Sequence, residues 1–111
     1  MVSKAKLRFL RIAPRKVRLV ADMIRGKQVE EALNILQFTT KRSSHPLAKL
    51  VKSAVANADQ KGGVNVDRLY VQTLTVDGGP MIKRFMPRAQ GRATPILHRT
   101  SHVTLTLAER E

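Results

Sequence analysis

The chain has 111 residues, of which 42% are hydrophobic, and its 21 lysines and arginines outnumber its 8 acidic residues to give a net charge of +13. This length suits one domain, and its core must be aliphatic because the sequence has 1 tyrosine and no tryptophan. The absence of cysteine excludes disulfides, zinc–thiolate sites and cysteine nucleophiles. No apolar segment approaches the roughly 20 residues of a membrane-spanning helix.

The excess positive charge is concentrated in two segments that contain no acidic residue. Residues 1–21 carry seven basic side chains and residues 78–108 carry five, so together they account for 12 of the 13 excess charges. A localised excess of one sign indicates an external partner that supplies the opposite charge. The phosphate backbone of a nucleic acid is the partner best suited to it.

The N-terminal segment predicts a strand followed by a helix. Basic and apolar residues alternate over residues 4–9, which is typical of a half-buried strand whose apolar side includes Phe9. Pro14 favours the start of a helix, and Gly26 favours its end.

Two further helices follow. One runs from about residue 28 to 38, and the other begins after Ser43–Ser44, whose hydroxyls we expect to cap it, and ends at Gly62–Gly63. In the earlier helix, which starts at Pro14, Asp22 follows Arg18 by four residues, and we expect these two side chains to pair. The apolar faces of the three helices consist of Val17, Val20, Ala21 and Ile24, then Val29, Ala32, Leu33 and Leu36, and then Leu47, Leu50, Val51, Ala54, Val55 and Ala58.

The C-terminal part has the period of two that is typical of strands. Residues 69–76 are rich in β-branched side chains, with a break near Thr73 that suggests a bulge, and residues 102–107 alternate regularly. The expected fold is α+β. Three helices pack on one face of a small three-stranded antiparallel sheet, in one domain that spans residues 1–111.

The segment between the last two strands, residues 78–101, is far longer than the two to five residues of a usual hairpin loop. Its best turn signal lies at residues 87–91. If the strands continue to that turn, each limb adds about 11 residues, or roughly 35 Å, whereas a compact domain of this length has a radius of gyration of about 13 Å. We therefore expect a projecting β-hairpin arm. A flexible basic loop is the alternative, although the apolar residues between the arginines disfavour disorder.

The sequence offers little support for catalysis. His98 and His102, if on one strand, lie roughly 13 Å apart, too far to bind one metal ion, and no acidic residue close in sequence could orient a histidine base. We expect no catalytic residue, metal or cofactor, and histidines hydrogen-bonded to RNA or to the sheet. A ribonuclease using His102 with Lys83 or Arg99 is one alternative. A helix-turn-helix DNA regulator is another, but it leaves the arm unexplained. Aromatic residues are too few for binding a single strand by stacking.

Three segments resemble the bacterial-type family of large-subunit ribosomal protein L-twenty-two. Residues 11–27, RIAPRKVRLVADMIRGK, and residues 53–58, SAVANA, are similar to parts of its first and third helices. The run KRFMPRAQGRATPILHRTSHVTLTL is similar to its signature, carried here by Lys83, Arg88, Ala89, Gly91, Arg92, His102, Val103, Leu105 and Leu107.

This resemblance implies a structural protein, not an enzyme, that binds large-subunit rRNA, helps the subunit assemble and resides in the cytoplasm. Its arm would line the nascent-peptide exit tunnel opposite ribosomal protein L-four, with other ribosomal proteins and the passing nascent peptide as further partners. No membrane or small-molecule substrate is implied, and we expect a monomer off the ribosome. The tunnel-lining tip would consist of Met86, Pro87, Arg88, Ala89, Gln90, Gly91, Arg92 and Ala93.

The residues expected to bind rRNA are the basic side chains and several polar neighbours. They are Lys4, Lys6, Arg8, Arg11, Arg15, Lys16, Arg18, Arg25, Lys27, Lys41, Arg42, Lys49, Lys52, Asn57, Lys83, Arg84, Arg88, Arg92, His98, Arg99, Thr100, Ser101 and His102.

Overall fold

The computed structural model describes residues 2–80, 82–87 and 93–109, with the side chains of residues 2–80 and 99–109. In chain order the elements are β1 (Ser3–Leu10), α1 (Pro14–Ile24), α2 (Val29–Phe38), α3 (Ser44–Lys61), the short 3-10 helix η1 (Val66–Arg68), β2 (Leu69–Gly78), β3 (Ile82–Pro87), β4 (Ala93–His98) and β5 (Ser101–Glu109). This order and these bounds agree with the expected helices and strands to within a few residues.

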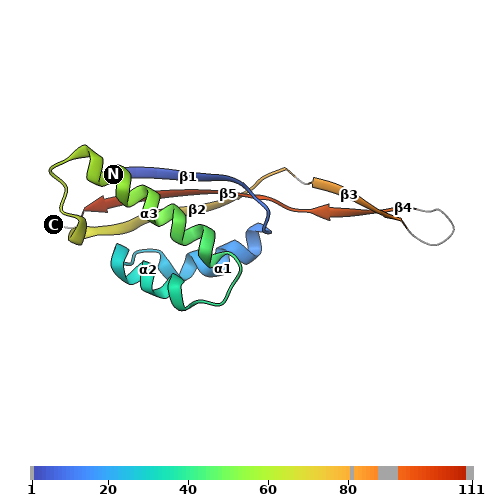
Figure 1. The fold of residues 1–111 in the computed structure, drawn as a ribbon, viewed down its shortest axis with the longest axis horizontal. Helices are drawn as coiled ribbons and strands as arrows, with labels where there is room; N and C mark the ends of the chain where they lie inside the picture. Colours follow the sequence, from blue (N-terminus) through green and yellow to red (C-terminus); the bar gives the residue numbers. More distant parts are fainter. Residues whose placement is uncertain (1, 81, 88–92, 110–111) are drawn as a thin grey trace.

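Strands β1, β5 and β2 form an antiparallel sheet in that order, with the C-terminal strand β5 in the centre (Figure 1). The register of β2 on β5 shifts between Val71 and Thr73, which confirms the predicted bulge. A second shift, between Leu7 and Leu10 of β1, has no counterpart in the sequence pattern. The two strands on either side of β5 are therefore both irregular at one position.

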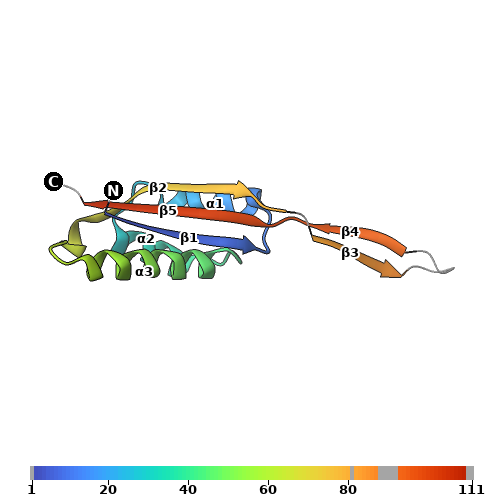
Figure 2. The same ribbon diagram turned by 90° about the horizontal axis from the view of Figure 1, so that it is seen from above.

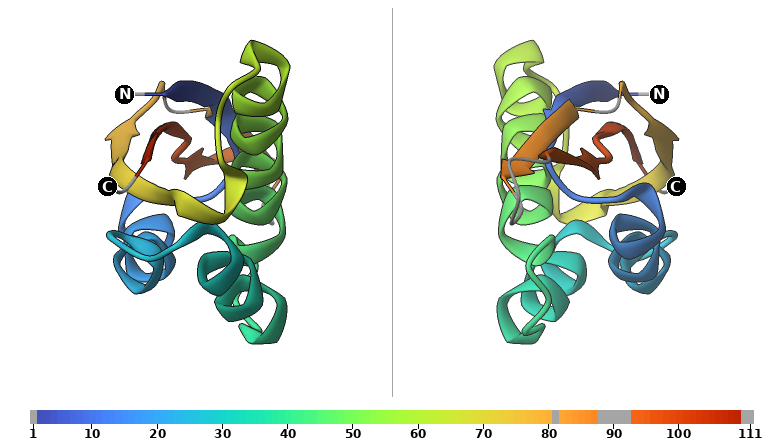
Figure 3. Two further views of the ribbon diagram at one scale, coloured as in Figure 1. Left: turned by 90° about the vertical axis from the view of Figure 1, so that its left-hand side faces the viewer. Right: turned by 90° about the vertical axis from the view of Figure 1, so that its right-hand side faces the viewer.

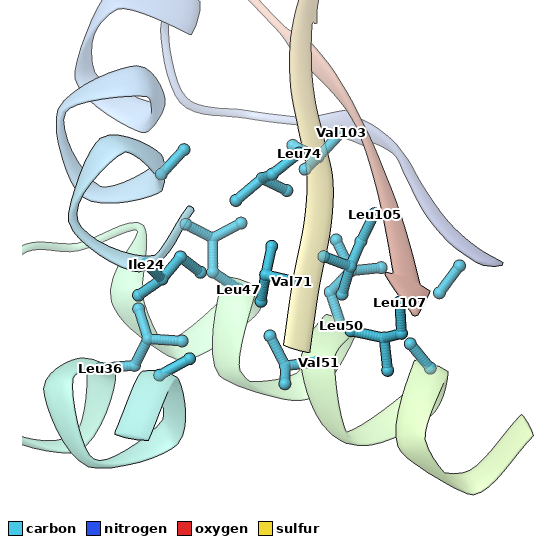
Figure 4. Packing of buried hydrophobic residues seen from close by; sticks show 14 of the residues in the cluster. Ile24, Leu36, Leu47, Leu50, Val51, Val71, Leu74, Val103, Leu105 and Leu107 are labelled. Atoms are coloured by element: carbon cyan, nitrogen blue, oxygen red, sulfur yellow. The ribbon is translucent and has the colours of Figure 1, made fainter. Parts of the chain in front are cut away.

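The three helices pack against one face of this sheet and leave the other face uncovered (Figures 2 and 3). The side chains of Ile24, Leu36 and Leu47 meet those of Val71 and Leu105 in one aliphatic core (Figure 4). Burying each such side chain contributes about 1.5–3 kcal/mol. This burial explains why the apolar faces predicted for α1, α2 and α3 are the ones that lie inside, with Leu33 and Val55 partly buried at the margin.

The start of α3 differs from the expectation of hydroxyl capping. Ser43 has helical dihedral angles and its side chain caps no backbone N–H, and its buried Oγ has no hydrogen-bond partner among the described residues. Ser44 Oγ instead donates back to the carbonyls of Lys41 at 2.7 Å and Thr39 at 3.1 Å. The Ser44 hydroxyl therefore stabilises the tight loop before α3 and does not cap the first backbone N–H groups of that helix. The helix ends as predicted, at Gly62 with a φ of +74° that favours glycine.

Strands β3 and β4 form a separate two-stranded antiparallel ladder that extends beyond the sheet as an arm (Figures 1 and 2). The molecule measures 65 × 25 × 16 Å with a radius of gyration of 17.1 Å, against the roughly 13 Å of a compact chain of this length. The arm is not a simple continuation of the sheet, because β2 ends at Gly78 and β5 begins only at Ser101. His98 and His102 therefore lie on different strands, so the one-strand separation considered for them does not apply.

Candidate nucleic-acid interface

The uncovered face of the sheet is polar, and it is basic along β1. Lys4 and Lys6 are exposed and alternate with the buried Ser3 and Ala5, so the period of two turns them away from the helices. Threonines of the central strand lie opposite them: Thr106 pairs with Lys4 and Thr104 with Lys6. This arrangement places cations along one edge of the uncovered face and hydroxyls in the middle.

Six exposed basic residues near the N-terminus have no side-chain hydrogen bond or ion pair with any described residue. They are Lys4, Lys6, Arg8, Arg11, Arg15 and Lys16. Arg11 follows β1 directly, and the segment that joins β1 to α1 lies at the end of the sheet from which the arm projects (Figure 1). The unpaired cations thus extend from the uncovered face of the sheet to the base of the arm.

Two arginines, Arg18 in α1 and Arg25 directly after it, have partners within the fold. Arg18 donates from Nε and Nη2 to the carbonyl of Val76, at 3.2 and 2.9 Å, and Arg25 Nε donates to the carbonyl of Leu74 at 2.8 Å. Because β2 is an edge strand, these carbonyls have no partner strand, and the guanidinium groups satisfy them. Both arginines line a groove of about 410 Å³ beside the edge of the sheet, so their remaining N–H groups can still meet an anion.

Asp22 pairs with Arg25 three residues away and not with Arg18 as expected. Arg18 directs both Nε and Nη2 to the Val76 carbonyl, whereas Arg25 binds the Leu74 carbonyl through Nε alone and has Nη1 left for Asp22. Both members of the pair are largely exposed, so it adds little stability. Lys27 makes a similarly exposed pair with Glu31 at 3.9 Å.

Other expected contact residues belong to the helical layer and not to the uncovered sheet face. Lys41, Arg42, Lys49 and Lys52 are exposed in α3 and the loop before it, and Asn57 donates weakly to the carbonyl of Lys4 at 3.4 Å. The structure thus places the four basic residues in a different layer from the cations of β1, whereas Asn57 lies beside that strand. Lys83, Arg84 and His98 lie on the ladder of the arm, Arg99 is exposed at its base, and Arg88 and Arg92 are outside the described residues.

The base of the arm is fastened by two buried hydroxyls. Thr100 Oγ1 donates to the carbonyl of Pro80 at 2.6 Å, and Ser101 Oγ donates to the carbonyl of Ile12 at 2.5 Å. Thr100 is 1% exposed and Ser101 0%. Both residues were expected to contact RNA, but in this structure their hydroxyls serve the fold.

His102 is held between Phe9 and Gly79. Its Nδ1 accepts a 3.1 Å hydrogen bond from the backbone N–H of Phe9, and a Cβ on Gly79 would lie only 3.2 Å from its Nε2. The prediction that a histidine hydrogen-bonds to the sheet is confirmed for His102. Among the described residues no carboxylate has a hydrogen bond to this imidazole, although Asp77 lies opposite His102 in the sheet. Among the described residues, no group of three or more metal-ligating side chains could hold a metal ion.

Phe9 is the residue that the sequence pattern misplaced. The alternation over residues 4–9 predicts an inward side chain, yet Phe9 is 60% exposed and has a φ of +58°. The register shift between Leu7 and Leu10 breaks the period of two at this point. No signal in the local sequence indicates that shift, because it depends on how β1 pairs with β5.

The helix-turn-helix alternative does not fit the charges of α2. In that motif the N-terminal residues of the second helix contact DNA bases. Here the first turn of α2 carries the exposed carboxylates of Glu30 and Glu31, which would be repelled by phosphates.

Among the described residues there is also no helix of the length and apolarity needed to cross a bilayer.

Comparison with known proteins decides the family. Residues 5–108 match the model of the family described as Ribosomal protein L22p/L17e. The chain belongs to this family. Proteins named large ribosomal subunit protein uL22 are similar to it over almost their full length. The one from Syntrophotalea carbinolica is 58% identical over 99% of this chain and 100% of its own. The relative from Geobacter sulfurreducens is 55% identical over 100% of both chains. The relative from Myxococcus xanthus is 60% identical over 98% of this chain and 97% of its own.

Proposed function

We propose that this chain is a structural constituent of the large ribosomal subunit, where it binds large-subunit rRNA and aids assembly, and that it is not an enzyme. The proposal is carried by the family match over residues 5–108. It is supported by similar proteins that are named as proteins of the large ribosomal subunit. As part of the subunit it acts in the cytoplasm and has rRNA and other ribosomal proteins as partners.

The unpaired cations supply the physical mechanism. Each lysine or arginine that neutralises a phosphate releases condensed counterions, so binding gains free energy in a salt-dependent way. Six such side chains between Lys4 and Lys16 lack a partner in the described part of the chain. Their distribution from the sheet face to the arm base suits contact with separate RNA segments. The basic residues of the helical layer, Lys41, Arg42, Lys49 and Lys52, form a second contact region.

The arm is the part that reaches into the subunit. Its two-stranded ladder projects beyond the sheet and carries Lys83 and Arg84, and no acidic residue occurs between residues 78 and 108 to oppose RNA. Residues 86–93 form the tip that lines the nascent-peptide exit tunnel, opposite the extended loop of ribosomal protein L-four. This assignment follows from the family signature within the arm. Residues 1–111 act as one ribosomal-protein domain, with the arm spanning residues 78–101.

The salt dependence of rRNA binding tests the proposal. We expect the affinity of the full chain for a large-subunit rRNA fragment to fall steeply with salt, each neutralised phosphate adding about 0.7–0.9 to the log–log slope. A DNA duplex of matched length serves as competitor, and gel analysis of the RNA checks its integrity. Equal affinity for the duplex, or a slope near zero, would contradict specific rRNA binding, and cleavage of the RNA would favour the nuclease alternative. Crosslinking of arm residues to rRNA in assembled subunits then tests the assignment of the tip.

A further inference from the structure

The exposed ring of Phe9 is held in a strained backbone conformation. A φ of +58° is a clear outlier for a bulky residue, and such strain persists only where surrounding interactions enforce it, most often at functional sites. The ring is nevertheless 60% exposed, so core packing does not account for the strain. The backbone here keeps an aromatic side chain in solvent.

The interactions that fix this conformation come from a residue far along the chain. The N–H of Phe9 donates to His102 Nδ1 at 3.1 Å, and the two rings meet edge to face with centroids 4.9 Å apart and planes 85° apart. Gly79 borders the other edge of the imidazole. The phenyl ring is therefore positioned in advance, and its exposed fraction shows that His102 covers only part of it.

The surroundings of the ring supply the remaining chemistry. Phe9 lines a hollow of about 330 Å³ together with Lys6, Arg8, Asp77 and Thr104. Lys6 and Arg8 make no ion pair with a described residue, which leaves both free to bind phosphate. The Asp77 carboxylate can accept hydrogen bonds from an exocyclic amino group, as acidic side chains do when they contact bases.

We propose that Phe9 is a stacking platform for one unpaired RNA base that carries an exocyclic amino group, with adenine preferred over uracil. The base stacks on the exposed ring, Lys6 and Arg8 bind the flanking phosphates, and Asp77 accepts from the amino group. Stacking on aromatic side chains is the usual way in which proteins hold a base that has left its helix. The inference rests on the proposed rRNA binding and adds to it one defined nucleotide site.

Phe38 provides a matched control within the same chain. It is 81% exposed at the end of α2, but it lines neither of the two hollows described above and its φ lies outside the positive region. An exposed phenyl ring alone is common on protein surfaces. The platform differs from Phe38 in its fixed backbone and in the charges around it.

The test uses the full chain and three RNA hairpins that are identical except for one position, where they carry an unpaired adenine, an unpaired uracil or no unpaired base. We expect the adenine hairpin to bind most tightly. Phe9→Ala should weaken that binding by about 5- to 150-fold, the range of one base stack, and should remove the preference. Phe9→Tyr should retain both, and Phe38→Ala should behave as the unchanged protein. A 2-aminopurine at the unpaired position should be quenched by the unchanged protein and by Phe9→Tyr but not by Phe9→Ala.

The outcomes separate this inference from the proposed function. Equal binding of all three hairpins by the unchanged protein, with a steep salt slope, would overturn the platform and leave rRNA binding intact. Retention of quenching and preference in Phe9→Ala would also overturn it. Failure to bind any hairpin or the rRNA fragment would reject both. If Phe9→Ala does not fold, as judged by circular dichroism, the Phe9→Tyr variant and the ranking of the hairpins decide.

Discussion

The side chain of Thr100 reaches across the base of the arm and donates a 2.6 Å hydrogen bond to the carbonyl of Pro80. The backbone repeats the link one residue earlier, where the N–H of Gly79 donates to the carbonyl of Thr100 at 2.9 Å. The two limbs are thus joined where they leave the sheet, and Ser101 ties the same point to Ile12. The arm therefore starts from a fixed base.

Removal of the Thr100 hydroxyl should loosen this base. Thr100→Val keeps the shape of the side chain but loses the bond to Pro80, so we expect a loss of about 1 kcal/mol in the free energy of unfolding. Chemical denaturation measures it. Thr104→Val is the control, since Thr104 lies on the uncovered face without a side-chain hydrogen bond among the described residues, and it should change stability by less than about 0.5 kcal/mol. Equal effects of the two variants would contradict the role given to Thr100.

A side chain at position 79 should disrupt the same region. In Gly79→Ala the new Cβ would lie 2.4 Å from Thr100 Oγ1 and 3.2 Å from His102 Nε2, so both must move, at a cost of about 1–3 kcal/mol. The adjacent Gly78→Ala is a close control, because its Cβ would meet only Pro14 Cγ at 4.0 Å. Thermal unfolding of the two variants should differ clearly, and similar midpoints would argue against the close packing at Gly79.

The arginines of α1 should divide into structural and RNA-binding types. Arg18→Ala leaves the Val76 carbonyl at the sheet edge without its donor, and we expect a loss of about 1–2 kcal/mol in stability. Arg15→Ala should leave stability nearly unchanged, because Arg15 is exposed and has no partner among the described residues, but it should reduce the salt slope of rRNA binding by about 1. The opposite pattern in the two variants would show that the roles are reversed.

Phe9→Gly should be more stable than Phe9→Ala by about 1 kcal/mol. Glycine adopts a φ near +58° without strain, whereas alanine does not. At Phe38, which ends α2, the order should reverse, because glycine in a helix is disfavoured relative to alanine by up to about 1 kcal/mol. Denaturation of these four variants compares the positions directly, and alanine more stable than glycine at position 9 would mean that the backbone there is unstrained in solution.

The arm tip should be dispensable for folding. Replacement of residues 86–93 by a short glycine-containing turn should leave one cooperative unfolding transition, because the described core residues belong to the helices, to β1, β2 and β5 and to the segment between β1 and α1. The same variant should bind the rRNA fragment more weakly. Loss of cooperative unfolding would contradict the separation of arm and core.

Several elements could be predicted because their signals are local. The apolar stripe from Val17 to Ile24 specifies a helix and its buried face wherever the helix packs, since burial follows the period of 3.6 residues. The alternation around Val103 and Leu105 does the same for a strand. The acid-free segment with its excess length likewise predicted an arm, because neither the charge nor the length could be accommodated in a short turn.

The tertiary structure decided which groups far apart in sequence meet. The pairing of β1 with β5 turned Phe9 outward and gave His102 its partner 93 residues away. The packing of α1 beside β2 brought Arg18 to a sheet-edge carbonyl and left Asp22 to Arg25. Hydrophobic periodicity reports only whether a side chain faces the core. The partner of a polar group is set by register and packing, which arise only when separate segments come together. For that reason the sequence determined the family, the secondary-structure elements and the charge of this protein, whereas the fold determined which residues are free to bind.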